Sequence, residues 1–119
     1  MGPMFRILDI ERIWSNRRVR SGPPLSVALE VHDPQIAGNE GAWTFRFADG
    51  RIEVVRGTTA VPDVQLRTRI DTLSRLFIGA VSSSTAVGAG AMEVTRGTGR
   101  LAEMDELLRL PRPWMFDRF

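Results

Sequence analysis

Apolar and polar side chains alternate most regularly over residues 25–32 of this 119-residue chain. Leucine and valine occupy every second position there, and Ser, Ala, Glu and His occupy the positions between them. This period of two is typical of a β-strand with one buried face. The pattern therefore predicts a half-buried strand. A loop over residues 33–41, which contain Pro, Asn and two Gly, is expected to follow it.

The segment 43–56 predicts a β-hairpin around the dipeptide Asp49-Gly50. A two-residue type I′ turn needs positive φ at both central residues, and Asp-Gly is one of the dipeptides that prefer it. The register that follows pairs Ala48 with Arg51, Phe47 with Ile52, Arg46 with Glu53 and Phe45 with Val54. This register places the large apolar side chains on one face and the opposite charges of Arg46 and Glu53 on the other. A slip of one residue would destroy both matches.

Three segments show the spacing of apolar residues that is typical of amphipathic helices. The first follows Asp9, a predicted N-cap, and runs to about Arg17. The second is expected to have Asp71 as its cap and to end near Gly79. The third starts near Arg100 and ends before the prolines of the last ten residues.

Three shorter stretches, residues 5–7, 64–69 and 92–95, have the composition of strands. Residues 80–91 are almost wholly Ala, Ser, Thr, Val and Gly, and they fit either a loosely formed helix over the sheet or a cavity wall. About five strands and three or four helices without regular βαβ alternation favour an α+β fold. We therefore expect one domain over residues 1–119, with helices packed on one side of a mostly antiparallel sheet.

Composition and charge narrow the classes of function. The 16 basic residues are all arginines, they are interleaved with 14 carboxylates, and the net charge is only +2. We therefore expect no nucleic-acid partner. The densest basic group, Arg17, Arg18 and Arg20, suits the negative end of the dipole of the helix before it.

The sequence also bears on compartment and on cysteine chemistry. The chain has no cysteine, which excludes thiol catalysis, disulfides and thiolate zinc sites. No apolar run approaches the roughly 18 residues of a membrane span. The N-terminus lacks the basic, apolar and small-residue order of a signal peptide. We therefore expect a cytoplasmic protein without a membrane span.

Glycine pairs at residues 88–90 and 97–99 are candidates for a phosphate-binding loop, and neither fits. A Walker loop requires a lysine, and the chain has none. The dinucleotide fingerprint requires a third glycine where Glu93 stands. The only histidine, His32, precedes Asp33 at a strand end. Because neighbouring side chains on a strand point to opposite faces, a strand-end residue is a better interpretation of His32 than an oriented general base.

The last six residues suggest a different chemistry. Trp114, Met115 and Phe116 are three large apolar residues close to Phe119, which also carries the α-carboxylate. A terminus this apolar is expected to dock against another surface. Docking would fix the carboxylate, and a carboxylate whose pKa is raised by burial can act as a base or bind an amine. An edge strand that completes the core is an equally good interpretation, and the two are compatible.

Four blocks of sequence and the last residue together resemble a known family. They are residues 4–11 (MFRILDIE), 25–34 (LSVALEVHDP), 48–50 (ADG) and 113–114 (PW), with Phe119 at the end. The chain is similar, nearly end to end, to the C-terminal domain of the enhanced-intracellular-survival type of bacterial GNAT N-acetyltransferase, which has the sterol carrier protein fold. The first two blocks are the more specific.

This resemblance implies a function that the residues alone do not. In that family two acetyltransferase domains precede the sterol-carrier-like domain and bind acetyl-CoA, and the proteins assemble as hexamers. The chain's terminal carboxylate is taken to be the general base toward the acceptor amine, and acceptors include aminoglycosides. The resemblance therefore implies a catalytic role for the carboxylate of Phe119. The residues that would line the acceptor side are Trp114, Met115, Phe116 and Asp117.

Three functions follow as alternatives. The first is a domain of an N-acetyltransferase that acetylates aminoglycoside-like or peptide amines. Such a domain has no cofactor site of its own, and its partners are the acetyltransferase domains and further copies of the chain. The second is a stand-alone carrier with an apolar ligand between the sheet and residues 80–91. The third is an oligomerisation domain. Residues 1–3, ahead of the matching block, suggest a domain that is excised or naturally detached.

Overall fold

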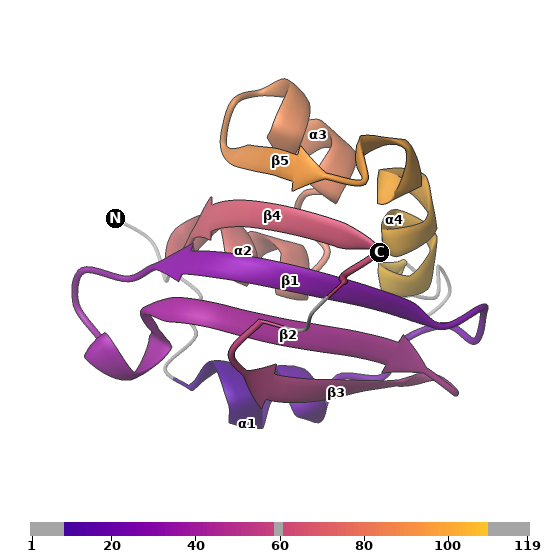
Figure 1. The fold of residues 1–119 in the computed structure, drawn as a ribbon, viewed down its shortest axis with the longest axis horizontal. Coiled ribbons are helices and arrows are strands. Elements are labelled where there is room, and N and C mark those ends of the chain that lie inside the picture. Colours follow the sequence, from indigo (N-terminus) through magenta and orange to yellow (C-terminus); the bar gives the residue numbers. More distant parts are fainter. Residues whose placement is uncertain (1–8, 59–60, 110–119) are drawn as a thin grey trace, which may run out of the picture.

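The computed structural model describes residues 9–58 and 61–109, and Figure 1 shows a five-stranded sheet with its helices on one face. The strands are β1 (Leu25–His32), β2 (Gly41–Ala48), β3 (Arg51–Arg56), β4 (Val64–Arg69) and β5 (Met92–Arg96). The helices are α1 (Ile10–Ser15), α2 (Ile70–Phe77), α3 (Ser83–Gly88) and α4 (Leu101–Leu108), with short 3-10 turns at Ala37–Asn39 and Thr98–Arg100. The predicted α+β class is confirmed. The predicted strand over residues 5–7 lies outside the described residues.

The order of the strands across the sheet is β3-β2-β1-β4-β5. Three neighbouring pairs are antiparallel, and only β1 and β4 are parallel. The parallel pair arises because the chain leaves β3 at one edge and passes β2 and β1 before it enters β4. Figure 1 shows this connection on the open face of the sheet, which is the face opposite the helices. Thr44 Oγ1 donates a 2.7 Å hydrogen bond to the carbonyl of Gly57, which ties the start of the connection to that face.

The hairpin of β2 and β3 has the predicted register throughout. Asp49 has φ 56° and Gly50 has φ 76°, so both turn residues adopt the left-handed conformation that a type I′ turn requires. On the open face, Arg46 Nη1 lies 3.3 Å from Glu53 Oε1, as the register predicts. The large apolar residues of the hairpin point to the other face and are buried.

The third predicted helix starts where expected, since Arg100 is the N-cap of α4, and the other two starts differ in their outcome. Asp9 is the N-cap of α1, and its Oδ1 accepts a 3.0 Å hydrogen bond from the Arg12 N–H, as predicted. The predicted cap of α2 is wrong, because the N-cap is Arg69 and Asp71 lies in the first turn. Strand β4 runs into α2 without a loop, and Ile70 is buried at the junction. Burial of Ile70 therefore fixes the start of α2, and no side chain caps it.

The small-residue stretch over residues 80–91 forms α3, which was one of its two predicted structures. A carboxylate on α4 holds the start of this helix. Asp105 Oδ1 accepts 2.6 Å and 2.5 Å hydrogen bonds from the backbone N–H and hydroxyl of Ser83, and its Oδ2 accepts from both groups of Ser84. A short helix of small residues gains little from its own propensity, so this tether to α4 accounts for its position.

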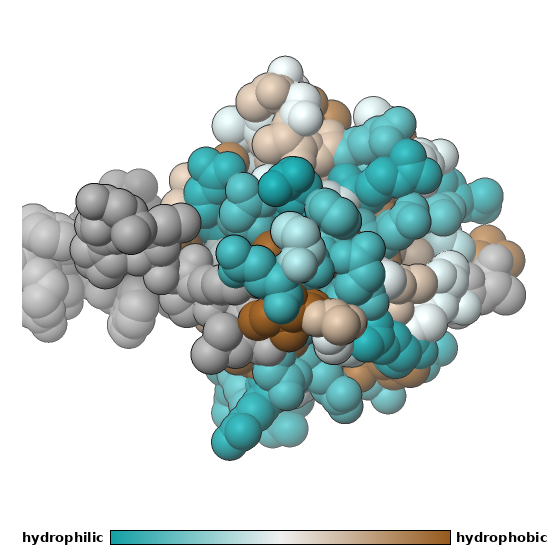
Figure 2. Space-filling model, turned by 90° about the vertical axis from the view of Figure 1, so that its left-hand side faces the viewer, coloured by the Kyte–Doolittle hydropathy of each residue, from teal (hydrophilic) through white to brown (hydrophobic). Residues whose placement is uncertain are grey.

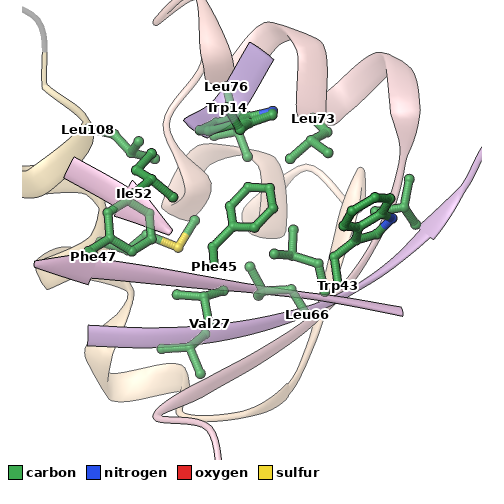
Figure 3. Packing of buried hydrophobic residues seen from close by; sticks show 14 of the residues in the cluster. Trp14, Val27, Trp43, Phe45, Phe47, Ile52, Leu66, Leu73, Leu76 and Leu108 are labelled. Atoms are coloured by element: carbon green, nitrogen blue, oxygen red, sulfur yellow. The ribbon is translucent and has the colours of Figure 1, made fainter. Parts of the chain in front are cut away.

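The core fills the space between the sheet and the helices (Figure 3). Trp14 of α1 lies over the sheet, with its ring centroid 5.1 Å from that of Phe45 and 5.0 Å from that of Phe77. Leu73 and Leu76 of α2 reach the same region from above. The cavity between these side chains measures only about 10 Å³, which is too small to hold a ligand.

Candidate functional site

The candidate site is the root of the C-terminal tail, by which we mean the end of α4 and the residues that hold it. The tail, residues 110–119, lies outside the described residues, and with it all the predicted site residues. These residues are Trp114, Met115, Phe116, Asp117 and Phe119. What the structure shows is where the tail begins. The last described residues before the tail are Leu107, Leu108 and Arg109.

Helix α4 ends differently from α2 and α3. After α2 and α3 the chain turns back at a glycine in the left-handed conformation, which is Gly79 with φ 75° after α2 and Gly90 with φ 79° after α3. In each case the next N–H bonds to a carbonyl five residues earlier, Ala80 to Arg75 at 2.9 Å and Ala91 to Ala86 at 2.8 Å. This arrangement is the Schellman motif, which satisfies the last carbonyls of a helix and reverses the chain.

No glycine follows α4, and the chain leaves it in an extended conformation. Arg109 has φ −63° and ψ 129°. The last two carbonyls of α4 are satisfied instead by the segment that follows α1. The N–H of Arg20 donates to the carbonyl of Leu107 at 2.9 Å, and Arg17 Nη2 donates to the carbonyl of Leu108 at 2.9 Å. Two hydrogen bonds from a distant segment therefore fix the end of α4.

Arg17 is the centre of this root. Its Nε donates a 2.8 Å hydrogen bond to the carbonyl of Phe77 at the end of α2, so one guanidinium binds the negative ends of two helices. The guanidinium carbon lies 5.9 Å from the ring centroid of Trp14 and 5.7 Å from that of Phe77. Arg17 is only 8% exposed, and burial lowers the pKa of its guanidinium from the usual value.

Ion pairs on the surface surround the root. Glu106 of α4 pairs with Arg20 at 3.6 Å and with Arg109 at 3.7 Å, all on exposed side chains. Exposed ion pairs of this kind contribute little stability individually, so the buried Arg17 is the main link between the ends of α2 and α4.

The sequence pointed to Arg17 only as part of a basic group at the end of its own helix. The structure shows that it binds the ends of two other helices, and a buried position three residues after Trp14 was the available signal.

The other candidates from the sequence lie elsewhere. His32 ends β1, and its Nδ1 lies 3.4 Å from Glu40 Oε1 with both side chains about half exposed. This exposed pair agrees with a strand-end residue. Gly90 belongs to the end of α3, where the helix dipole repels a phosphate. Gly97 is packed against the backbone of Asp63. Within residues 9–58 and 61–109, no three His, Asp or Glu side chains gather as a metal site.

Figure 2 shows the side that lies at the left of Figure 1, where hydrophilic residues predominate around a small hydrophobic area. None of the helices in the described part of the chain is both long and apolar enough to cross a membrane.

The fold, with its mixed five-stranded sheet and helices on one face, defines an α+β domain of the sterol carrier type. The model of one family, described as "Sterol carrier protein domain", matches residues 10–116. The chain belongs to this family. Among proteins with curated descriptions, none has a sequence that matches significantly.

Solved structures of larger proteins contain a region with a similar fold. A probable N-acyltransferase from Enterococcus faecalis V583 matches 87% of this chain with 25% identity and a TM-score of 0.76. A GCN5-related N-acetyltransferase from Anabaena variabilis matches 89% with 22% identity and a TM-score of 0.76. Eis1 from Mycobacterium abscessus matches 87% with 20% identity and a TM-score of 0.67. The chain covers 25%, 26% and 24% of those three proteins respectively, so it spans about a quarter of their length. The expected resemblance to the sterol-carrier-like domain of the enhanced-intracellular-survival type is confirmed at the level of the fold.

Proposed function

We propose that this chain is the C-terminal domain of a GNAT N-acetyltransferase and that the terminal carboxylate of Phe119 acts as the general base. The observation that carries the proposal is the extended conformation in which the chain leaves α4 at Arg109. After α2 and α3, by contrast, the chain turns back at a glycine. Two structural neighbours, a probable N-acyltransferase and a GCN5-related N-acetyltransferase, support it. In this proposal the residues on the acceptor side are Trp114, Met115, Phe116 and Asp117.

The chemistry requires only a carboxylate at a fixed place. An acceptor amine is mostly protonated at neutral pH, and it must lose a proton before it can attack the thioester carbon of acetyl-CoA. The carboxylate of Phe119 accepts that proton. The new C–N bond then forms and the C–S bond breaks, and the thiolate of CoA leaves and takes up the second proton, which the acylated nitrogen loses. General bases of this kind contribute about 10² to 10⁴ in rate.

The other components come from outside this chain. Acetyl-CoA binds to the acetyltransferase domains of the same protein, which are the first partners of this domain. Further copies in a homo-oligomer are the second.

The packing of the interior favours this function over a lipid carrier. The space enclosed by Trp14, Phe45, Leu73 and their described neighbours measures about 10 Å³, whereas ligand sites of small molecules measure about 300–1,000 Å³. The carrier alternative placed its ligand between the sheet and residues 80–91. In the structure this stretch forms α3, which is held against α4 by Asp105.

The test uses the full-length acetyltransferase and varies only its last residue. Deletion of Phe119, or addition of one glycine after it, moves the carboxylate by about 3.5 Å and is expected to lower kcat by about 10² or more. Phe119→Ala is the matched control, because it keeps the carboxylate in place and removes only the ring. Acetyl-CoA consumption is measured with neomycin and with a lysine peptide as acceptors. Unchanged kcat after both the deletion and the extension contradicts the proposal.

A further inference from the structure

The open face of the sheet, opposite the helices, has a hollow at the end where the hairpin of β2 and β3 turns. Its volume is about 670 Å³, which falls within the range of about 300–1,000 Å³ that is usual for sites of small molecules. Short side chains leave this space free, because Ser26 of β1 and Ala48 of β2 lie on this face and Pro24 precedes β1. The hairpin and Ser15 of α1 form further walls, and Asp63 at the end of the crossover connection borders one side.

Four charged side chains line the hollow, and both of its carboxylates already have partners. Glu53 Oε1 lies 3.3 Å from Arg46 Nη1. Asp63 Oδ1 lies 3.0 Å from Nη1 of Arg100, which is not a lining residue. Within the described part of the chain, Arg51 makes no ion pair and no side-chain hydrogen bond. The positive charge of Arg51 is therefore not neutralised, and its donors are unused.

Arg46 and Arg51 lie close enough to bind one ligand together. The register pairs Ala48 with Arg51, so Arg46 is the diagonal neighbour of Arg51 on the same face of the hairpin. The Cβ atoms of diagonal neighbours are about 7–8 Å apart, which long side chains can bridge. The turn before Arg51 is also held in place, since the N–H of Val19 donates a 3.1 Å hydrogen bond to the carbonyl of Gly50. The two guanidinium groups therefore project from a fixed backbone.

A second hollow on the same face shows that an unpaired guanidinium is not general there. This hollow measures about 420 Å³, and Glu30 and Arg67 are among its lining residues. Arg67 Nε lies 3.0 Å from Glu30 Oε1, and its Nη1 lies 2.9 Å from Glu93 Oε1. These two carboxylates raise the pKa of the Arg67 guanidinium. The cation of the second hollow is therefore fully paired, unlike Arg51.

We propose that the hollow at the hairpin end binds a small molecule through a carboxylate or phosphate group, with Arg51 as its first ligand and Arg46 as its second. A guanidinium offers parallel N–H donors that match two oxygens of either group. A cationic ligand would find both carboxylates of the hollow already paired, and a lipid would meet charged side chains along its walls. The site goes beyond the proposed function and does not depend on the role of Phe119.

The test is a titration of the 119-residue chain, followed in NMR spectra of its backbone amides. The probes are inorganic phosphate and acetate at pH 7, each at constant ionic strength with sodium chloride as the reference. We expect saturable shifts at residues 24–26 and 46–53, with a Kd of about 1–10 mM for the tighter probe. Tighter binding of phosphate identifies a phosphorylated ligand, and tighter binding of acetate identifies a carboxylate.

Three variants of the hollow and one control separate a specific site from general attraction by charge. Arg51→Gln should weaken binding about tenfold or more, because it removes the guanidinium without another partner. Arg46→Gln should weaken binding severalfold. Glu53→Gln should tighten it, because this change releases Arg46 from its ion pair. Arg75→Gln is the matched control, since Arg75 is an exposed arginine of α2 without an ion pair among the described residues. The dispersion of each spectrum shows that the variant is folded.

The results either support the site or overturn it. Loss of binding in Arg51→Gln together with unchanged binding in Arg75→Gln supports it. Equal losses in these two variants show that net charge alone attracts the probe, and they overturn the proposal. The absence of saturable shifts with either probe up to about 100 mM, about ten times the weakest expected Kd, overturns it as well. Neither result bears on the general base, which is tested by kcat in the full-length acetyltransferase.

Discussion

Asp63 and Ser26 bind each other through both side chain and backbone. Asp63 Oδ2 accepts a 2.9 Å hydrogen bond from the Ser26 N–H, and the Asp63 N–H donates to the Ser26 carbonyl at 2.9 Å. The second oxygen, Oδ1, lies 3.0 Å from Arg100 Nη1 just before α4. One carboxylate thus joins β1, the end of the crossover connection and the start of the helix that carries the tail.

The stability contributed by Asp63 should depend on pH. The hydrogen bond from the Ser26 N–H lowers the pKa of the Asp63 carboxyl below its usual 3.8, and the charge of Arg100 lowers it further. The contribution is therefore complete above pH 3.8 and is lost as the pH falls through the lower pKa of the folded state. We expect Asp63→Asn to reduce the free energy of unfolding by about 1 kcal/mol at pH 7, measured by urea denaturation.

The same comparison at low pH checks the cause. The difference between the parent chain and Asp63→Asn should narrow as the pH falls below 3.8 and through the lower pKa of the folded state, because Asp63 then becomes protonated and uncharged like asparagine. Glu53→Gln, which removes only an exposed ion pair with Arg46, should change stability by less than about 0.5 kcal/mol. A difference for Asp63→Asn that is the same at every pH contradicts this account.

Gly97 should tolerate no side chain. Its φ is 80°, and a Cβ there would lie 2.2 Å from the carbonyl oxygen of Asp63, which is backbone and cannot move aside easily. Gly97→Ala should therefore lower the free energy of unfolding by at least about 2 kcal/mol, the sum of backbone strain and overlap. Gly99→Ala, two residues later, meets nothing within 4 Å and should cost less than about 1 kcal/mol. Equal stabilities of the two variants in thermal denaturation would contradict the prediction.

Leu73 should be sensitive to truncation because the core around it is already full. It is 1% exposed and lines the 10 Å³ space between the sheet and α2. Leu73→Ala should lower the free energy of unfolding by about 2–5 kcal/mol, measured by chemical denaturation.

Native mass spectrometry should find no lipid on the freshly purified parent chain. A co-purified lipid of stoichiometric amount would instead support the carrier alternative.

Removal of the buried charge at Arg17 should destabilise the chain through the carbonyls that it leaves without a donor. We expect Arg17→Met to lower the free energy of unfolding by about 2–4 kcal/mol, because the carbonyls of Phe77 and Leu108 lose their partners inside the protein. Arg12→Met, on the exposed side of the preceding helix, should change stability by less than about 0.5 kcal/mol. The opposite result, a stable Arg17→Met, would mean that apolar packing can replace the guanidinium.

Local patterns predicted the elements that depend on local interactions. The Asp49-Gly50 turn and its hairpin register were predictable because a two-residue turn and a one-sided apolar pattern each allow a single register. The cap at Asp9 was also predictable, because its hydrogen bond from the Arg12 N–H spans only three residues. Asp71 was misassigned as a cap because burial of Ile70 at the strand–helix junction overrides a capping preference.

Other features depend on contacts between distant segments. Alternation along Leu25–His32 specifies which face of β1 is buried, but it does not specify β4 as the parallel neighbour of that strand. The tether of Asp105 to Ser83 and the clamp of Arg17 on Leu108 join residues far apart in the chain. No sequence period marks such pairs.

The amino-acid sequence by itself determined the strands, the hairpin, the α+β class and the apolar character of the tail, because each follows from neighbouring residues and from a period of two or of about 3.6. The tertiary structure alone decided that β4 lies beside β1, that the described side chains around Leu73 leave only a small space, and that Arg17 binds the carbonyl of Leu108 at the end of α4. The physical reason is that these features arise from the packing of distant segments, in which a buried donor binds whichever carbonyl the fold brings within its reach.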